Sequence, residues 1–164
     1  MYRVGILTAS DMGSVGKRED LSAKTIREEV SVQGWQVAAY RIVPDDIDTI
    51  IEALIDMVDR EKLDLILTTG GTGFSPRDNT PEATKSVIEK EVPGIPEVMR
   101  AVSLKKTPRA MLSRATAGIR HRTLIINLPG SQKAVKECLE AIMDSLPHGL
   151  EILTGRGGEC GSPS

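Results

Sequence analysis

Short aliphatic runs alternate with amphipathic stretches along the chain. Four runs are apolar and short enough to be buried strands. They cover residues 2–9, 35–43, 63–69 and 122–128. Residues 21–33 favour a helix that Gly34 ends, because glycine commonly follows a helix C-terminus. Residues 47–58 place isoleucine, leucine and valine at a spacing of three and four, which is typical of an amphipathic helix.

The second half of the chain continues the alternation. Thr80 as N-cap, followed by Pro81 at the first helical position, predicts a helix that reaches about Lys90. Residues 95–114 are expected to form short helical segments. After the last strand, a turn at Pro129–Ser131 leads into another helix with one apolar stripe. Strands that alternate with helices favour an α/β fold, with a mostly parallel sheet between two helical layers.

The length of 164 residues favours one domain. We expect it to span residues 1–154, and we expect residues 155–164, which are rich in glycine and serine, to form a flexible C-terminal tail. No apolar run approaches the ~20 residues of a membrane span. Met1 leads directly into an apolar strand rather than a signal peptide, so we expect a cytoplasmic protein without a membrane partner.

Charge and composition exclude several classes of protein. The 21 basic and 23 acidic residues give a net charge of −2, which argues against a nucleic-acid partner. Only four aromatic residues are present, so bases have no stacking platform. The two cysteines belong to no CxxC pair or Cys/His cluster, and a zinc site is therefore unsupported.

Unusual loops directly follow all four expected strands. The first strand leads into SDMGSVG, the second into Pro44-Asp45, the third into GGTGFSPRD and the last into Pro129-Gly130-Ser131. If the strands are parallel, these loops meet at one edge of the sheet. Ligands of open parallel sheets bind at that edge.

The residues of these loops suit a phosphorylated ligand. Glycines let backbone N–H groups approach phosphate oxygens, and helix N-termini add partial positive charge. Carboxylates at the same edge would repel a bare phosphate, but they are reasonable ligands for a Mg²⁺ ion that accompanies it. These carboxylates belong to Asp11, Asp45 and Asp78. The edge therefore predicts a site for a nucleotide with its metal ion.

Each feature also has a purely structural interpretation. Asp45 and Asp78 both precede expected helices and could serve as caps. Arg77 taken alone would be a solvated surface charge, and Ser113 beside Arg114 carries no signal of its own. Two common nucleotide motifs are absent, because GxxxxGK[ST] occurs nowhere and a proline stands where a third glycine of GxGxxG would be.

Four stretches together resemble one known family. TTGGTGFSPRDNTPEAT, SDMGSVGKRED, LSR and LIINLPGSQKAVKECLE are similar to the molybdopterin adenylyltransferases of molybdenum-cofactor biosynthesis. The resemblance covers residues 3 to about 153. It implies adenylylation of molybdopterin by Mg-ATP, with release of pyrophosphate. It also implies a homotrimer and hand-over of the product to a molybdenum insertase.

The resemblance assigns roles to individual positions. Asp45 and Asp78 match the two catalytic aspartates that would hold Mg²⁺. The positions that match nucleotide- and pterin-binding residues are Ser10, Asp11, Asp20, Gly70, Gly71, Thr72, Gly73, Ser113, Pro129, Gly130 and Ser131. The alternative is a carrier that binds molybdopterin or nucleotide without turnover. Retention of both aspartates favours the enzyme.

Overall fold

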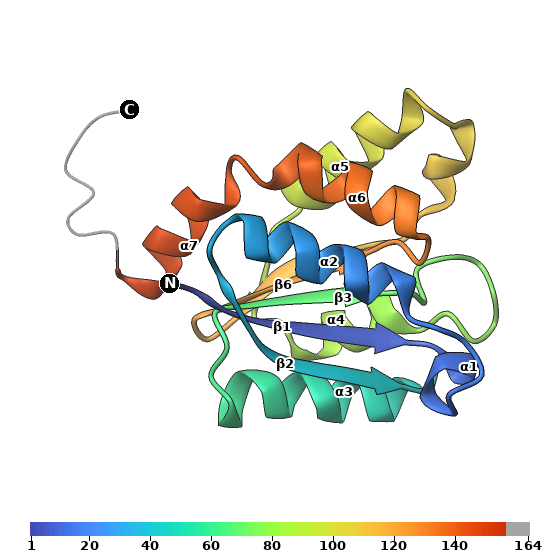
Figure 1. Cartoon of the computed structure of the whole chain (residues 1–164), viewed down its shortest axis with the longest axis horizontal. Helices are drawn as coiled ribbons and strands as arrows, with labels where there is room; N and C mark the ends of the chain where they lie inside the picture. The colour runs from blue at the N-terminus through green and yellow to red at the C-terminus, as the bar shows by residue number, and fades with distance from the viewer. Residues whose placement is uncertain (157–164) are drawn as a thin grey trace.

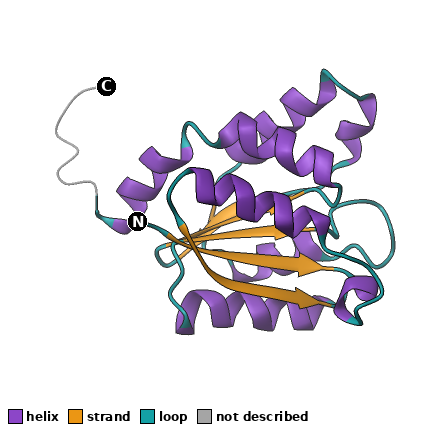
Figure 2. Cartoon of the chain, in the orientation of Figure 1, coloured by secondary structure: helices purple, strands orange, loops and turns teal. Residues whose placement is uncertain are grey.

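A six-stranded sheet forms the centre of the protein (Figures 1 and 2), whose computed structural model describes residues 1–156. The strand order is β2-β1-β3-β6-β5-β4. Four strands run parallel, and they are β1 (Arg3–Ala9), β2 (Gln36–Val43), β3 (Leu65–Thr69) and β6 (Thr123–Leu128). At one end β5 (Ala117–Arg120) and β4 (Lys90–Glu91) continue the sheet with antiparallel pairing. The prediction of a mostly parallel sheet is confirmed.

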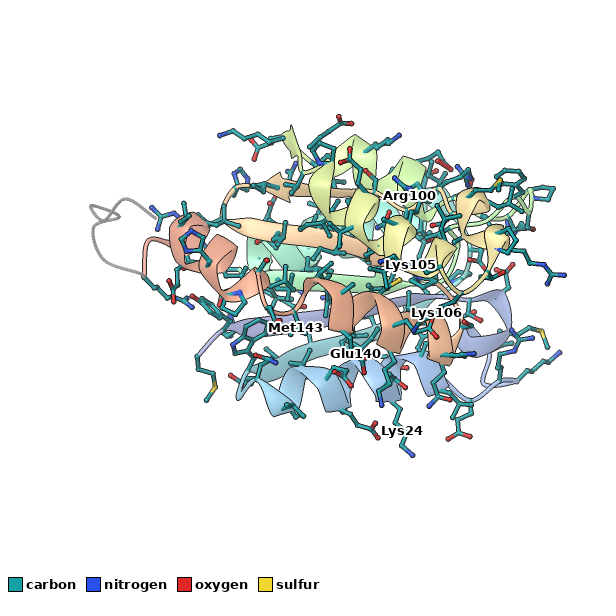
Figure 3. The ribbon with its side chains drawn as sticks, turned by 90° about the horizontal axis from the view of Figure 1, so that it is seen from above. Lys24, Arg100, Lys105, Lys106, Glu140 and Met143 are labelled. Carbon is teal, nitrogen blue, oxygen red and sulfur yellow. The ribbon has the colours of Figure 1, made fainter. Side chains whose placement is uncertain are left out.

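Helices cover both faces of this sheet, as the three-layer prediction requires. On one face lie α2 (Leu21–Val32), α5 (Gly94–Leu104), α6 (Gln132–Ile142) and α7 (Leu146–Thr154). On the other lie α3 (Ile47–Ile55), a π-helical turn η1 (Asp56–Arg60) and α4 (Thr80–Val87). Figure 3 looks onto the first layer, where α5 and α6 lie side by side. Within residues 1–156 no helix is both long and apolar enough to cross a membrane.

Alternation along the central strands explains why apolar residues follow one another directly in the middle of each strand. Ile6 packs into the core under α2 and α6, whereas its neighbour Leu7 packs into the core under α3. Ile126 and Ile125 divide between the same two cores. A strand that is buried on both faces needs an apolar residue at every position rather than at every second one.

Two expected boundaries were wrong. The loop expected after the first strand contains a short helix, α1 (Asp11–Ser14), which Ser10 caps through its hydroxyl. The helix expected from Thr80 to Lys90 ends at Val87, and Asn79 occupies its N-cap position. The chain leaves the helix there because Lys90 pairs with β5 as part of an edge strand. Tertiary pairing thus overrides the local helical pattern.

The sequence pattern also missed strand β5. Its four residues, AGIR, contain a glycine and are too few to show alternation. Gly118 is required there because a Cβ would lie 2.7 Å from the Lys90 carbonyl oxygen and 2.4 Å from Ile88. The tail expected at 155–164 lies outside the described residues from 157 onward. Arg156 pairs with the buried Asp64 at 3.0 Å.

A buried amide joins three elements of the core. Asn127 is fully buried, and its Nδ2 donates to the hydroxyls of Thr68 (3.0 Å) and Thr84 (2.9 Å). Its Oδ1 accepts from the N–H of Thr116 at 3.2 Å. Asn127→Leu should lower the free energy of unfolding by about 2–4 kcal/mol, because three buried polar groups lose their partner. Urea denaturation measures this, and an equal loss in the exposed control Gln33→Leu would contradict it.

Candidate functional site

The register of the sheet brings the four loops together. Ala9 at the end of β1 lies opposite Val43 of β2, and Thr8 lies opposite Thr69 of β3. Thr69 in turn lies opposite Leu128 of β6. All four parallel strands therefore end at the same edge, as the sequence predicted.

A polar cleft of about 400 Å³ opens at this edge. Most of the sequence-predicted residues line it, namely Ser10, Asp20, Asp45, Gly70, Gly71, Asp78 and Gly130. Arg18 and Gln132 line the cleft as well, and sequence reasoning missed both because neither belongs to a recognisable motif. Arg18 is the one cationic side chain among the described residues that line this cleft.

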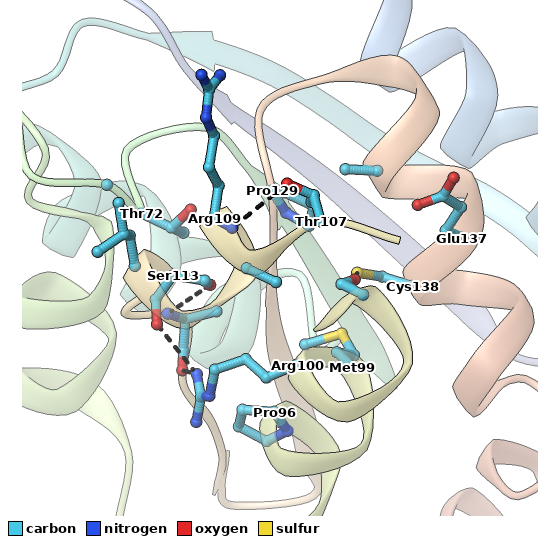
Figure 4. Close-up of a pocket in the computed structure, with 16 residues that line it drawn as sticks. Thr72, Pro96, Met99, Arg100, Thr107, Arg109, Ser113, Pro129, Glu137 and Cys138 are labelled. Carbon is cyan, nitrogen blue, oxygen red and sulfur yellow. Dashed lines mark hydrogen bonds between the residues drawn. The ribbon is translucent and has the colours of Figure 1, made fainter. Parts of the chain in front are cut away.

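The segment between β3 and α4, residues 70–79, is the glycine loop. A second, mainly apolar hollow of about 290 Å³ lies on the other side of this loop. Figure 4 shows it, with Thr72 and Ser113 on one side and Cys138 on the other. Of the predicted residues, Thr72, Gly73, Ser113 and Pro129 line this hollow. The predicted set is therefore divided between two neighbouring hollows. Asp11 and Ser131 line neither of these two hollows; Ser131 caps α6 by accepting from the N–H of Ala134.

The backbone of the glycine loop admits no side chain at two positions. Gly70 and Gly71 have φ of +89° and +71°. A Cβ on Gly70 would lie 2.4 Å from the carbonyl oxygen of Ala9, and one on Gly71 would lie 2.3 Å from Oγ1 of Thr80. That Oγ1 is buried and has no hydrogen-bond partner among the described residues. The glycines are therefore needed for close approach as well as for the left-handed conformation.

Arg114 holds the glycine loop in place. Its Nε donates to the carbonyl oxygen of Gly73 and its Nη2 to that of Asp78, both at 2.8 Å. Its Nη1 donates to both carboxylate oxygens of Glu82 at 2.8 Å. Its own N–H donates to the carbonyl of Thr72 at 2.9 Å. Sequence reasoning missed this role because only the tertiary fold brings Arg114 to the loop.

Arg114→Met should loosen residues 70–79. Two loop carbonyls and a carboxylate lose charge-assisted hydrogen bonds, so we expect about 1–3 kcal/mol less stability and faster amide exchange in the loop. Hydrogen exchange and thermal unfolding measure both effects. Arg122→Met is the matched control at the opposite end of the sheet, and equal exchange in the two variants would contradict this role.

The two predicted metal-binding carboxylates have different surroundings. The N–H of Asp11 donates to Oδ2 of Asp45 at 3.0 Å, and the N–H of Ser75 donates to Oδ2 of Asp78 at 2.9 Å. Burial raises the pKa of the Asp45 carboxyl, although the Asp11 N–H opposes this, and the charges of Asp11 and Asp78 raise it further. A cation near Asp45 would relieve this unfavourable clustering of negative charge.

The donor set fits Mg²⁺ that arrives with phosphates. Within residues 1–156 no group of three or more His, Cys, Asp or Glu side chains could hold a metal ion alone. Mg²⁺ in nucleotide sites commonly takes one or two carboxylates and fills its remaining positions with water and phosphate oxygens. Asp45 and Asp78 supply two such carboxylates beside one cleft.

Asp20 has a structural role in addition to its place in the cleft. It caps α2 by accepting from the N–H of Ala23 at 3.0 Å, and its other oxygen accepts from the hydroxyls of Thr8 and Tyr40. Burial and the adjoining Asp20 raise the pKa of Tyr40. The carboxylate is therefore held rigidly at the rim of the cleft.

Comparisons with known proteins identify the family of this chain. Residues 5–148 match the family model described as a probable molybdopterin binding domain. The chain is 49% identical to the molybdopterin adenylyltransferase of Helicobacter pylori strain J99, over 93% of this chain and 88% of that protein. It is 46% identical to the molybdenum cofactor synthesis protein cinnamon of Drosophila melanogaster, over 91% of this chain but 25% of that protein.

The fold also agrees with a solved structure. The crystal structure of the molybdopterin biosynthesis enzyme MoaB from Thermus thermophilus superposes with a TM-score of 0.90 at 55% identity, and the match covers 94% of this chain and 98% of that one. The family and the fold class predicted from the sequence are both confirmed. The prediction of an enzyme is confirmed as well, since the relatives are named molybdopterin adenylyltransferase. The chain belongs to the molybdopterin-binding domain family of molybdenum-cofactor biosynthesis proteins.

Proposed function

We propose that the protein is a molybdopterin adenylyltransferase that uses Mg-ATP and releases pyrophosphate. The observation that supports this most is the polar cleft, where Asp45 and Asp78 lie beside the left-handed glycines Gly70 and Gly71. A protein that only carried an anionic pterin would gain nothing from two carboxylates in its binding cleft. Names of the relatives, molybdopterin adenylyltransferase among them, support the same activity.

In the proposed reaction, an oxygen of the molybdopterin phosphate attacks the α-phosphorus of ATP. A new P–O bond forms, and the bond from the α-phosphorus to the bridging oxygen breaks. Pyrophosphate leaves with the electron pair of that bond. Such a reaction needs positioning and charge neutralisation more than covalent help from the protein.

Different residues of the chain would contact the phosphates, hold the metal ion and neutralise charge. Backbone N–H groups of the glycine loop would approach the phosphate oxygens, since no Cβ stands in the way at Gly70 or Gly71. Asp45 and Asp78 would hold Mg²⁺, which when bound supplies positive charge against the transferred phosphate. Arg18, the one cationic side chain among the described residues of the cleft, would add positive charge against the phosphates.

The apolar hollow suits a flat ring system. Its described lining includes Pro96 and Met99 of α5 and Leu112 of the short 3-10 helix η2 (Pro108–Leu112), together with Ser113 and Pro129. The glycine loop lies between it and the polar cleft, because Gly70 and Gly71 line the cleft while Thr72 and Gly73 line the hollow. A ring bound in the hollow could therefore place an attached phosphate in the cleft.

A product assay tests the proposal. Purified protein is incubated with molybdopterin, ATP and Mg²⁺, and adenylyl-molybdopterin is separated by chromatography. The proposal predicts product that disappears when EDTA removes the divalent cation. Tight molybdopterin binding without product would instead favour the carrier hypothesis.

Two further expectations accompany this proposal. The homotrimer is a prediction from the family, and light scattering would test it by giving three times the chain mass of 17.7 kDa. Hand-over of the product to a molybdenum insertase is consistent with cinnamon, where a region like this chain occurs within a much longer protein. A cytoplasmic location is likewise still a prediction.

A further inference from the structure

Asp11 was expected to contact the nucleotide, but its carboxylate is already engaged within the protein. Its Oδ2 accepts from Nε of Arg77 at 3.1 Å, and its Oδ1 accepts from Nη2 of Arg77 at 2.9 Å. The same Oδ1 also accepts from the N–H of Asp45 at 2.9 Å. Both carboxylate oxygens are therefore used before any ligand arrives.

Asp11 and Asp45 bond to each other in both directions. The N–H of Asp11 donates to Oδ2 of Asp45 at 3.0 Å, while the N–H of Asp45 donates to Oδ1 of Asp11. This closed pair fixes the Asp45 backbone and one of its carboxylate oxygens. The other oxygen of Asp45 accepts no hydrogen bond among the described residues.

The resulting chain of contacts joins three loops that follow three different strands. Asp11 follows β1, Asp45 follows β2, and Arg77 belongs to the glycine loop after β3. The bidentate pair spans 66 residues of sequence. A substitution of Arg77 can therefore alter the orientation of Asp45 through Asp11, although the side chains of Arg77 and Asp45 share no hydrogen bond.

The exposure of this ion pair limits what it can do for stability. The side chains of Arg77 and Asp11 are 57% and 44% exposed. Exposed ion pairs contribute little to folding free energy, because solvent screens them and ordering the side chains costs entropy. A bidentate geometry retained at so exposed a place is better explained by the orientation it imposes on Asp45.

We propose that Arg77 and Asp11 are positioning residues, which orient the Asp45 carboxylate toward the cation of the nucleotide and do not bind the nucleotide themselves. This inference rests on the proposed function, since it concerns the same site. It reassigns Asp11 from a ligand contact to a support for Asp45. It also assigns a role to Arg77, which the sequence alone would describe as a solvated surface charge.

A measurement on the free protein tests the positioning directly. In Arg77→Met, Asp11 loses its bidentate partner, and the N–H of Asp45 should exchange with solvent about threefold to tenfold faster. The thermal unfolding temperature should stay close to the wild-type value. Arg60→Met is the matched control, because Arg60 is an exposed arginine paired with Asp56 at 2.8 Å far from the cleft. Unchanged exchange at Asp45 in Arg77→Met would overturn the proposal.

A double-mutant cycle then separates positioning from ligand contact. Calorimetry measures binding of Mg²⁺ with a non-hydrolysable ATP analogue to the wild type, Arg77→Met, Asp11→Ala and the double variant. If Arg77 acts through Asp11, Arg77→Met weakens binding about tenfold in the wild type but less than about twofold in Asp11→Ala. Equal factors in both backgrounds would show that Arg77 contacts the nucleotide itself. A wild type that binds no Mg-nucleotide would contradict the proposed function, whereas the exchange result would still decide the positioning.

Discussion

Asp78→Asn is expected to slow adenylyl transfer about 10²- to 10³-fold while the protein stays folded. The asparagine Oδ1 can still accept from the N–H of Ser75, so the loop keeps its hydrogen bond. What is lost is the negative charge that would hold the cation against the developing phosphate charge. Pre-steady-state product formation at saturating Mg-ATP measures the rate.

Asp46→Asn supplies the matched control for this variant. Asp46 is the neighbour of Asp45, but its carboxylate caps α3 by accepting from the N–H and the hydroxyl of Thr49. Asparagine can still cap the helix, so the substitution should cost less than about 1 kcal/mol of stability and leave the transfer rate nearly unchanged. If Asp78→Asn also left the rate unchanged, the assignment of the metal site would be wrong.

Gly70→Ala is expected to lower the free energy of unfolding by more than about 2 kcal/mol and to weaken nucleotide binding at least about tenfold. The new Cβ would lie 2.4 Å from the carbonyl oxygen of Ala9, a backbone atom within β1 that cannot move aside cheaply. The left-handed φ of +89° adds strain for any residue with a side chain. The loop must therefore shift away from the strand end that forms the cleft. Urea denaturation and calorimetry measure the two effects.

Substitutions at two other glycines distinguish the steric clash at Gly70 from the strain of its left-handed backbone. Gly16 has a φ of +73° but open space around its Cβ position, so Gly16→Ala should show only the conformational cost of about 1 kcal/mol. Gly149 lies within helix α7 with open space, and Gly149→Ala should stabilise the protein by about 0.5–1 kcal/mol. If Gly70→Ala behaved like Gly16→Ala, close packing of the loop against Ala9 would not be what requires glycine.

The parts of the fold that could be predicted were those with local causes. Short aliphatic runs identified β1, β2, β3 and β6. In β1, β3 and β6 these runs follow from burial on both faces, whereas β2 lies at an edge of the sheet and is only partly buried. β5 and β4 could not be predicted, since they are short and exist through pairing with a neighbouring strand. Likewise Val87 ends its helix because the chain beyond it joins the sheet.

The same distinction between local and tertiary causes applies to the residues of the candidate site. Gly70 and Asp78 could be selected because several loops with unusual residues each follow a strand, and parallel strands bring their ends together. Arg114 and Arg77 could not, because their roles depend on partners at residues 73, 78, 82 and 11 that only the folded chain supplies. For the same reason, sequence could not show that Thr72 and Gly73 face a different hollow from Gly70 and Gly71.

The fate of an isotopic label tests the central claim most directly. The protein is supplied with molybdopterin and Mg²⁺, and with ATP labelled at either the α- or the γ-phosphate. Adenylyl transfer predicts that the α label appears in the molybdopterin product and the γ label in pyrophosphate, in equal amounts. A γ label on molybdopterin would show phosphoryl transfer instead. Molybdopterin bound without either label would show that the cleft with Asp45 and Asp78 holds its ligands but does not transfer between them.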